Sequence, residues 1–277
     1  MYLRRGYLFI LVLFSSWAFL SCRANSWIGG ASRHEADSAK VNDGSAIVSE
    51  TMGPFRTQTY SATVNITKIY KNGLRYDDVL RFYSKSDQRD HIRLLMLIKP
   101  QAERKGAGLL IEMQNNELLS GYRFIPESKT VVPVNSKKRF VDVVVGGLSL
   151  QDFQLMQGLT PFAEMRIHGR EEIEGRLCDV IEVIPFDNSQ YHHARLFTTV
   201  AERLPVVVRA FSQDGAVIKE IVFDKLEQVG QNWVVIQLTV IEKKFNYTST
   251  FKFENVQVNP RIDDSVFTPD FLQKGYS

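Results

Sequence analysis

The chain has 277 residues, of which 34 are Lys or Arg and 31 are Asp or Glu, giving a formal net charge of +3. Arg4 and Arg5 lie in a segment that we expect to be removed, and without them 32 cations face 31 acids. Because binding to phosphates depends on an excess of positive charge, this balance argues against a nucleic-acid partner and gives no reason to expect strong attraction to anionic lipid.

The first 22 residues predict an export signal. Arg4 and Arg5 precede the uncharged and mostly apolar run 7–20. At about 1.5 Å of rise per residue, this run is short for a membrane span and is typical of the apolar centre of a secretory signal. We therefore expect the mature protein to work outside the cytoplasm, where nucleotide-driven chemistry is disfavoured.

The cleavage position has more than one interpretation. Residues 19–22 (FLSC) resemble a bacterial lipobox, in which Cys22 would be diacylated and two buried chains would hold the protein on a membrane. Cleavage after Ala24 and an uncleaved anchor are the alternatives. Residues 23–56 are rich in Ser, Gly, Ala and Asn, and they predict a flexible tether with a weak helix between Ala39 and Thr51.

The second cysteine, Cys178, lies among apolar residues. If Cys22 is acylated or removed, Cys178 has no partner for an intramolecular disulfide. We interpret it as a small buried apolar side chain, with a reactive thiol as the alternative.

From Thr57 onward the sequence has the period of β-strands. Apolar side chains recur at every second position in residues 60–70, and Asn72-Gly73 is a strong hairpin signal. Similar runs separated by short turns continue to Val258, and they predict about eleven strands. Tight turns make neighbouring strands antiparallel. The chain therefore reads as mainly β, with one domain over residues 57–277.

Two predicted strands, 204–212 and 233–243, are apolar on both faces. A sheet with one face in water needs apolar side chains on its other face only, so we expect the second face of these strands to be covered as well. One interpretation is packing by the protein itself, and the other is an apolar concave side that receives an acyl chain.

Motifs for catalysis or cofactor binding are absent from the sequence. There is no GxSxG, GxxxxGK[ST], GxGxxG or HExxH pattern. His192 and His193 are adjacent, so on a strand they point to opposite faces and are poorly placed to share a metal. We predict no enzyme activity, no cofactor and no metal site.

Four stretches in order resemble the bacterial outer-membrane lipoprotein-sorting proteins, the LolA/LolB-like group. They are 106–111 (GAGLLI), 121–126 (GYRFIP), 204–211 (LPVVVRAF) followed by Asp214-Gly215, and 263–268 (DDSVFT). The resemblance extends over residues 57–272.

This resemblance implies a single curved, antiparallel half-barrel, an unclosed β-barrel, with short helices covering the concave face. It also implies a protein of the periplasm or outer membrane that binds the acyl chains of lipoproteins or other lipids, with a protein partner in lipoprotein transport. The soluble carriers of this group are not lipidated, so Cys22 favours a membrane-anchored acceptor over a free shuttle.

Strand alternation suggests which side chains line a lipid pocket, with ordinary core packing as the alternative for each. The candidates are Val64, Ile66, Leu95, Leu97, Leu110, Phe124, Val183, Ile221, Phe223, Ile236, Leu238, Phe251 and Phe253.

Two other functions are compatible with these residues and motifs. The first is a periplasmic regulatory sensor of the same fold that binds a protein partner, and the second is a surface lipoprotein without a transport role.

Overall fold

The structure is a computed structural model that describes residues 43–87, 91–99, 106–114, 117–134, 145–156, 163–185 and 190–274. All of them belong to one compact unit, Lys40–Ser277. The export signal, Cys22 and the first part of the tether lie outside the described residues.

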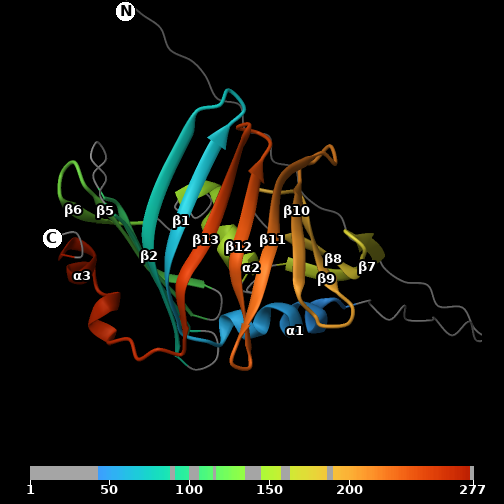
Figure 1. The fold of residues 1–277 in the computed structure, drawn as a ribbon, viewed down its shortest axis with the longest axis horizontal. Helices are drawn as coiled ribbons and strands as arrows, with labels where there is room; N and C mark the ends of the chain where they lie inside the picture. The colour runs from blue at the N-terminus through green and yellow to red at the C-terminus, as the bar shows by residue number, and fades with distance from the viewer. Residues whose placement is uncertain are drawn as a thin grey trace, which may run out of the picture. The chain divides into compact units, whose positions relative to one another are not determined.

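Thirteen strands form one antiparallel sheet in this part of the chain, rather than about eleven (Figure 1). The strands are β1 (Tyr60–Tyr70), β2 (Arg75–Asp87), β3 (His91–Ile98), β4 (Gly108–Gln114), β5 (Glu117–Ile125), β6 (Thr130–Pro133), β7 (Ala163–Ile173), β8 (Arg176–Pro185), β9 (His193–Thr199), β10 (Pro205–Phe211), β11 (Val217–Val229), β12 (Asn232–Glu242) and β13 (Tyr247–Val258).

The sheet consists of two meanders that meet in its middle. Its order is β6-β5-β4-β3-β2-β1-β13-β12-β11-β10-β9-β8-β7, so each half follows the chain and the first strand pairs with the last. The sheet is unclosed because β6 and β7 are its two edges. This arrangement places the N-terminal and C-terminal strands side by side at the centre.

Short helices connect and cover the sheet. They are α1 (Ser45–Arg56), the 3-10 turn η2 (Val145–Gly147), α2 (Leu150–Met156), the 3-10 turn η3 (Asp264–Phe267) and α3 (Pro269–Lys274). The helix expected between Ala39 and Thr51 thus begins at Ser45 and continues to Arg56. Its residues Val48 and Met52, four positions apart, are buried on one side of the helix.

Helix α2 begins with the cap that its sequence indicates. The Ser149 hydroxyl accepts a hydrogen bond from the Asp152 backbone N–H at 3.1 Å, and the Asp152 carboxylate accepts one from the Ser149 backbone N–H at 2.7 Å. This reciprocal pair satisfies backbone donors that the first turn leaves free. It fixes the helix start although the helix is only seven residues long.

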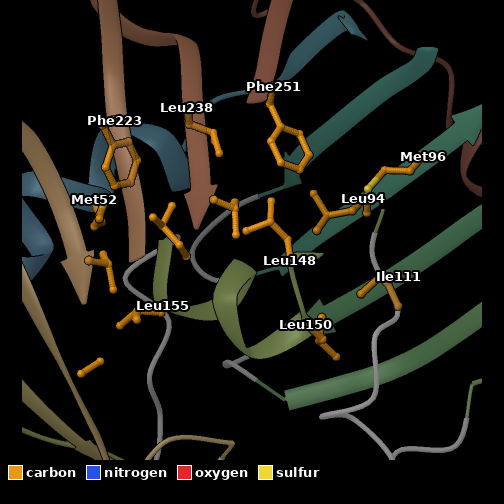
Figure 2. Packing of buried hydrophobic residues seen from close by; sticks show 14 of the residues in the cluster. Met52, Leu94, Met96, Ile111, Leu148, Leu150, Leu155, Phe223, Leu238 and Phe251 are labelled. Atoms are coloured by element: carbon orange, nitrogen blue, oxygen red, sulfur yellow. The ribbon is translucent and has the colours of Figure 1, made fainter. Parts of the chain in front are cut away.

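The main core lies between the helices and the concave face of the sheet. Leu94 of β3 and Leu196 of β9 belong to the same buried cluster as Met52 of α1 and Leu155 of α2. In the strand order, β3 and β9 are seven places apart, and in a flat sheet they would lie about 34 Å from each other. The sheet must therefore bend around the helices. Figure 2 shows Leu148 in the middle of this cluster, just before α2.

Two glycines let the segment before α2 approach the sheet closely. A Cβ on Gly146 would lie 2.4 Å from the Phe251 ring, and one on Gly147 would lie 2.3 Å from the Tyr247 hydroxyl. Both glycines also have positive φ angles, 74° and 91°. No other residue type meets both conditions, so this loop can press against β13 only because it carries glycine here.

The convex face is also covered in places, in agreement with the two-sided apolar strands. On β10, Val208 faces the main core, whereas Val207 joins Cys178 and Phe197 in a second cluster. The guanidinium of Arg209 lies 4.8 Å above the Phe197 ring on that side. For β10, therefore, the protein's own side chains cover the second face.

Candidate functional site

An apolar cavity of about 130 Å³ lies between the concave face and the two helices α1 and α2. Strands β1, β2, β3, β11, β12 and β13 supply most of its wall. Its lining residues are Phe55, Tyr60, Ala62, Val64, Leu80, Phe82, Ser84, Met96, Leu148, Phe153, Met156, Phe223, Val234, Val235, Leu238, Phe251, Phe253 and Val256.

The cavity exists because a small residue faces a large one across the central strands. Val64 of β1 stands opposite Leu80 of β2 and Phe253 of β13. Two positions away, Ala62 stands opposite Phe82. Directly opposed side chains of a sheet touch when both are large. The methyl group of Ala62 leaves space that Phe82 alone does not fill.

The cavity has a buried floor and a half-buried rim. Val64, Leu148 and Leu238 of the floor are at most 4% exposed. The rim is aromatic, and Phe55 of α1 and Phe153 of α2 are both half-buried there. Aromatic rings that remain partly in water beside an apolar hollow are typical of a small-molecule site.

A bulge near the end of β13 brings one more apolar residue to this wall. The register between β1 and β13 shifts by one residue between the Ser61–Gln257 and Thr63–Glu254 pairs, and Asn255 has φ of 52°. An extra residue in one strand reverses the alternation beyond it. Val256 therefore lines the cavity together with Phe253.

Polar groups occur at one end of the cavity. The Tyr60 hydroxyl donates a hydrogen bond to the Gln58 side-chain oxygen, and the Gln58 amide donates to Asn232 Oδ1 at 2.6 Å. Burial raises the pKa of Tyr60 above its ordinary value of 10.0. The phenol is thus neutral at physiological pH and serves as a hydrogen-bonding group beside an otherwise apolar wall.

A buried ionic cluster lies further along the same face, where the start of β11 pairs with the end of β12. Lys219 Nζ lies 3.0 Å from Asp152 Oδ2 and 3.5 Å from Glu242 Oε2, and it donates to the Gly147 carbonyl at 3.0 Å. The Tyr191 hydroxyl donates to Asp152 Oδ1. Burial is the main reason why the pKa of Tyr191 is raised well above 10.0. The cluster joins α2 and the glycine loop to the sheet.

The structure brings some of the predicted pocket residues together. Five of them line the cavity, namely Val64, Phe223, Leu238, Phe251 and Phe253. Three more, Ile66, Val183 and Ile221, lie in the main core on the same face. Ile236 is half-buried on β12.

Four predicted residues lie on the opposite face of the sheet. Leu95, Leu97, Leu110 and Phe124 form a separate buried cluster with Phe267 and Leu272 of the C-terminal segment. β3 is apolar on both faces, so alternation separates Leu95 from its neighbour Leu94 but does not say which one faces inward. The cavity residue of this strand is Met96.

Sequence reasoning did not identify the helical part of the site. Phe55, Phe153 and Met156 come from α1 and α2. Phe153 and Met156 are three positions apart and so lie on one side of α2. This spacing predicts an apolar side of the helix, but any amphipathic helix has the same spacing. Only the packing of the helix against the sheet shows that this side faces a cavity.

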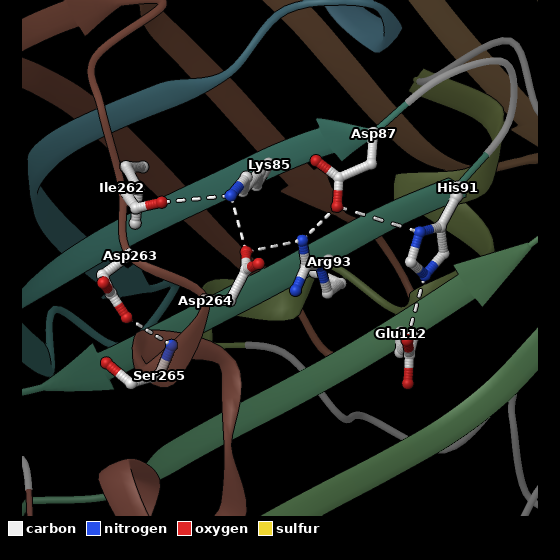
Figure 3. A network of polar contacts seen from close by, with 9 residues as sticks. All are labelled: Lys85, Asp87, His91, Arg93, Glu112, Ile262, Asp263, Asp264 and Ser265. Carbon is white, nitrogen blue, oxygen red and sulfur yellow. Dashed lines mark hydrogen bonds and ion pairs between the residues drawn. The ribbon is translucent and has the colours of Figure 1, made fainter.

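The C-terminal segment, residues 262–274, covers the convex face through an ionic network (Figure 3). Lys85 Nζ lies 2.6 Å from Asp264 Oδ1, and Arg93 lies 2.9 Å from the same oxygen. The hydrogen bond from Lys85 is the main cause of a lowered Asp264 pKa. Nearby, His91 Nε2 lies 2.9 Å from Glu112, and this hydrogen bond lowers the pKa of Glu112.

Other candidate sites can be checked against the described residues. Cys178 is fully buried, and burial raises the pKa of its thiol, as expected for an unreactive cysteine. Within this part of the chain, no three His, Cys, Asp or Glu side chains are grouped to hold a metal ion. Nor does any described helix have the length and apolar character needed to cross a membrane.

A family model described as "-like: Uncharacterized protein" matches residues 90–274, and the chain belongs to this family. Among curated proteins, none matches the chain.

Several solved structures share the fold. A DUF1329 family protein from Desulfovibrio piger ATCC 29098 is 17% identical, with a TM-score of 0.73 over 83% of this chain and 97% of its own. A putative outer membrane lipoprotein-sorting protein domain from Vibrio parahaemolyticus is 15% identical, with a TM-score of 0.71 over 82% and 95%. A LolA superfamily protein from Nitrosomonas europaea is 14% identical, with a TM-score of 0.65 over 83% and 99%.

Identities this low establish a common fold and not a common activity. The chain therefore has the fold of the LolA superfamily, and the resemblance seen in its sequence motifs is confirmed as one of fold.

Proposed function

We propose that the protein binds an acyl chain of a lipid or lipoprotein in the bacterial envelope. The observation that carries this proposal is the apolar cavity between the concave face and the helices α1 and α2. Burial of hydrocarbon contributes about 0.8 kcal/mol for each CH₂ removed from water, so a hollow of this kind favours an aliphatic guest over a polar one.

The cavity volume limits the length of acyl chain that fits between the sheet and the helices as they lie in this structure. About 130 Å³ is close to the volume of an engineered cavity that holds benzene, and below the roughly 300–1,000 Å³ of ordinary ligand sites. A longer chain therefore needs Phe55 or Phe153 at the rim to move outward. Both side chains are already half-buried rather than fully packed.

The proposed setting is the periplasm, with the domain held at the outer membrane through an acylated Cys22 and the tether after it. The export signal and the lipobox-like residues support this setting, as does the fold shared with a lipoprotein-sorting domain. An anchored protein with an apolar hollow would act as an acceptor of lipid or lipoprotein, with a protein partner delivering the cargo.

Substitution of Ala62 by Phe tests the proposal. The added ring enters the cavity opposite Phe82, so we expect lipid that co-purifies with the wild type to be lost from Ala62→Phe. Native mass spectrometry of protein isolated gently from the envelope measures this occupancy.

The matched control is Thr63→Phe, which adds the same ring to the next residue, on the other face of β1. It should retain the lipid. Wild type that carries no lipid at all, or equal occupancy in Ala62→Phe and Thr63→Phe, would contradict the proposal.

A further inference from the structure

Two hairpin turns lie side by side at the end of the central strands that is opposite to the cavity. They are the β1–β2 turn, residues 71–74, and the β12–β13 turn, residues 243–246; together we call them the hairpin tips (Figure 1). Tyr70 pairs with Tyr247 where the two hairpins meet, and the Lys71 backbone N–H donates to the Asn246 carbonyl at 2.9 Å. The tips therefore form one structural unit.

Large apolar side chains are exposed at this unit. Ile69 is 44% exposed, Leu74 is 47% exposed and Phe245 is 54% exposed. They are three of the six large apolar side chains that are exposed in the described part of the chain. Single exposed apolar residues need no explanation, but half of them gathered at one end of the molecule do.

Cations surround these side chains. Lys71, Lys243 and Lys244 lie in the turns themselves and are exposed. Lys243 forms an ion pair with Glu220 at 2.9 Å, whereas no acid among the described residues forms an ion pair with Lys71 or Lys244. Lys244 Nζ lies 5.4 Å from the centre of the Phe245 ring, so a charge and an exposed aromatic ring sit together.

The strands just below the tips add to the positive charge. Lys68 Nζ lies 3.6 Å from the centre of the Tyr247 ring. Arg75 is paired with Asp77 at 2.8 Å, so its charge is largely balanced.

A groove of about 570 Å³ runs across the tips. Lys71, Lys243 and Asn246 line it together with the rings of Tyr70 and Tyr247. Glu242 also borders the groove, but its carboxylate lies 3.5 Å from the buried Lys219. Because Lys243 is paired with Glu220, the groove offers the Lys71 ammonium group and the two tyrosines to a small negatively charged group.

We propose that the hairpin tips dock on the surface of an anionic lipid bilayer. Leu74 and Phe245 would enter the boundary between headgroups and acyl chains, while Lys71 and Lys244 would meet the headgroup phosphates. Apolar and aromatic side chains ringed by lysines are the composition that binds this boundary. The backbone of a hairpin turn is already hydrogen-bonded, so its insertion into the boundary leaves few polar groups unsatisfied.

The tips lie beyond one end of the cavity. On β13, the cavity residue nearest to the tips is Phe251, which is four residues from Tyr247. At about 3.3 Å for each residue of strand, the cavity begins about 13 Å from Tyr247. A molecule docked by its tips would hold the cavity away from the bilayer, where a delivering partner could reach it. Docking by the tips is independent of what the cavity binds.

Vesicle binding by the exported Cys22→Ala chain, which cannot be acylated, tests the proposal. We expect the chain to float with vesicles of phosphatidylcholine containing phosphatidylglycerol, and far less with pure phosphatidylcholine. Each lysine near such a surface strengthens binding about fivefold, so Lys71→Gln with Lys244→Gln should weaken it about twenty-fivefold. In the same background, Leu74→Ser with Phe245→Ser should abolish flotation.

Control variants on other surfaces separate docking from a general effect of polarity or charge. Leu119→Ser with Leu177→Ser replaces two equally exposed apolar residues of β5 and β8, and Lys252→Gln removes an exposed lysine from the middle of β13. Both should bind as the Cys22→Ala chain does. A tryptophan at position 245, introduced as Phe245→Trp, should shift its emission to the blue when the anionic vesicles are added.

Three results would overturn the proposal. One is that the Cys22→Ala chain fails to prefer the anionic vesicles, and another is that the tip variants and the control variants bind equally. The third is that the tip variants change self-association of the chain instead of vesicle binding, which would make the tips a contact between protein copies.

Discussion

At the scale of single residues, Lys219 is the most informative side chain of the molecule. It is 4% exposed and is held by Asp152, by Glu242 and by the Gly147 carbonyl. A buried ion pair adds little net stability over an apolar pair of equal size, but it tolerates few alternative arrangements. We infer that Lys219 fixes where α2 and the glycine loop lie on the sheet, and so sets the shape of the cavity wall that Leu148 and Phe153 form.

Substitution of Lys219 by Met should therefore destabilise the protein by about 3–5 kcal/mol, because it leaves the Asp152 carboxylate buried without its cation. Urea denaturation monitored by circular dichroism measures the change. The control is Lys225→Met, which removes an exposed partner of Glu227 and should change the free energy of unfolding by less than about 0.5 kcal/mol. Equal effects of the two substitutions would show that Lys219 has no special role.

The sequence predicted only part of this arrangement. The Ser149 cap and Asp152 at the third helical position were both readable, because a cap is a local pattern. The buried position of Lys219 was not predictable, because its partner Asp152 is 67 residues away in the chain. A lysine in a strand is ordinarily a solvent-facing residue, and only the course of the chain back over the sheet buries this one.

At the scale of elements, the C-terminal segment 262–274 and the pair α1 and α2 cover opposite faces of one sheet. The C-terminal segment covers Leu95 and Leu97 with Phe267 and Leu272. Its polar attachment is Asp264, which meets Lys85 and Arg93. Arg93 also lies 5.1 Å from the centre of the Phe267 ring. Charge and apolar contact thus hold the same short segment.

The attachment of this segment should depend on pH. Lys85 and Arg93 hold the pKa of Asp264 below its ordinary value of 3.8. A lowered carboxyl pKa contributes stability that is complete above the unfolded value and is lost as the pH falls through the folded value. Asp264→Asn should therefore increase hydrogen exchange in residues 262–274 at pH 7, and the difference from the wild type should vanish only once the pH falls below the lowered pKa of Asp264.

The control for this prediction removes a charge from the same segment at a place with no such partners. Asp270 is exposed in the first turn of α3, and Asp270→Asn should leave exchange at pH 7 close to that of the wild type. A difference between Asp264→Asn and the wild type that persists in strong acid would show that the ion pairs are not the cause.

Strands were easier to predict than their inner faces. Turns such as Asn72-Gly73 and Asp214-Gly215 are local signals, and both hairpins are present in the sheet. The inner face of β3 was not predictable, because Leu94, Leu95 and Leu97 are all buried. The helices α1 and α2 cover one face of the sheet and the C-terminal segment covers the other, so both faces are apolar. The alternation of side chains then no longer shows which face is the inner one.

At the scale of the whole folded unit, the course of the chain creates the hollow. The first strand pairs with the last, so Val64 of β1 meets Phe253 of β13, and α1 and α2 lie on the side toward which the sheet bends. The sequence motifs predicted this bent sheet only through their likeness to the lipoprotein-sorting proteins. The cavity volume, the bulge at Asn255 and the cluster of charges at the hairpin tips depend on long-range register. The net charge of the chain did not indicate the charge cluster at the tips, because a nearly neutral chain can still place several lysines at one end.

Photolabelling is the most direct test of the central claim, that an acyl chain occupies the space between the concave face and the two helices. A long-chain fatty acid carrying a diazirine, equilibrated with the protein and irradiated, should label peptides that contain Phe55, Phe153 or Phe253. An excess of unlabelled fatty acid should prevent the labelling. Labelling that falls instead on the convex cluster of Leu95 and Phe124, or that an excess of unlabelled fatty acid does not reduce, would contradict the account.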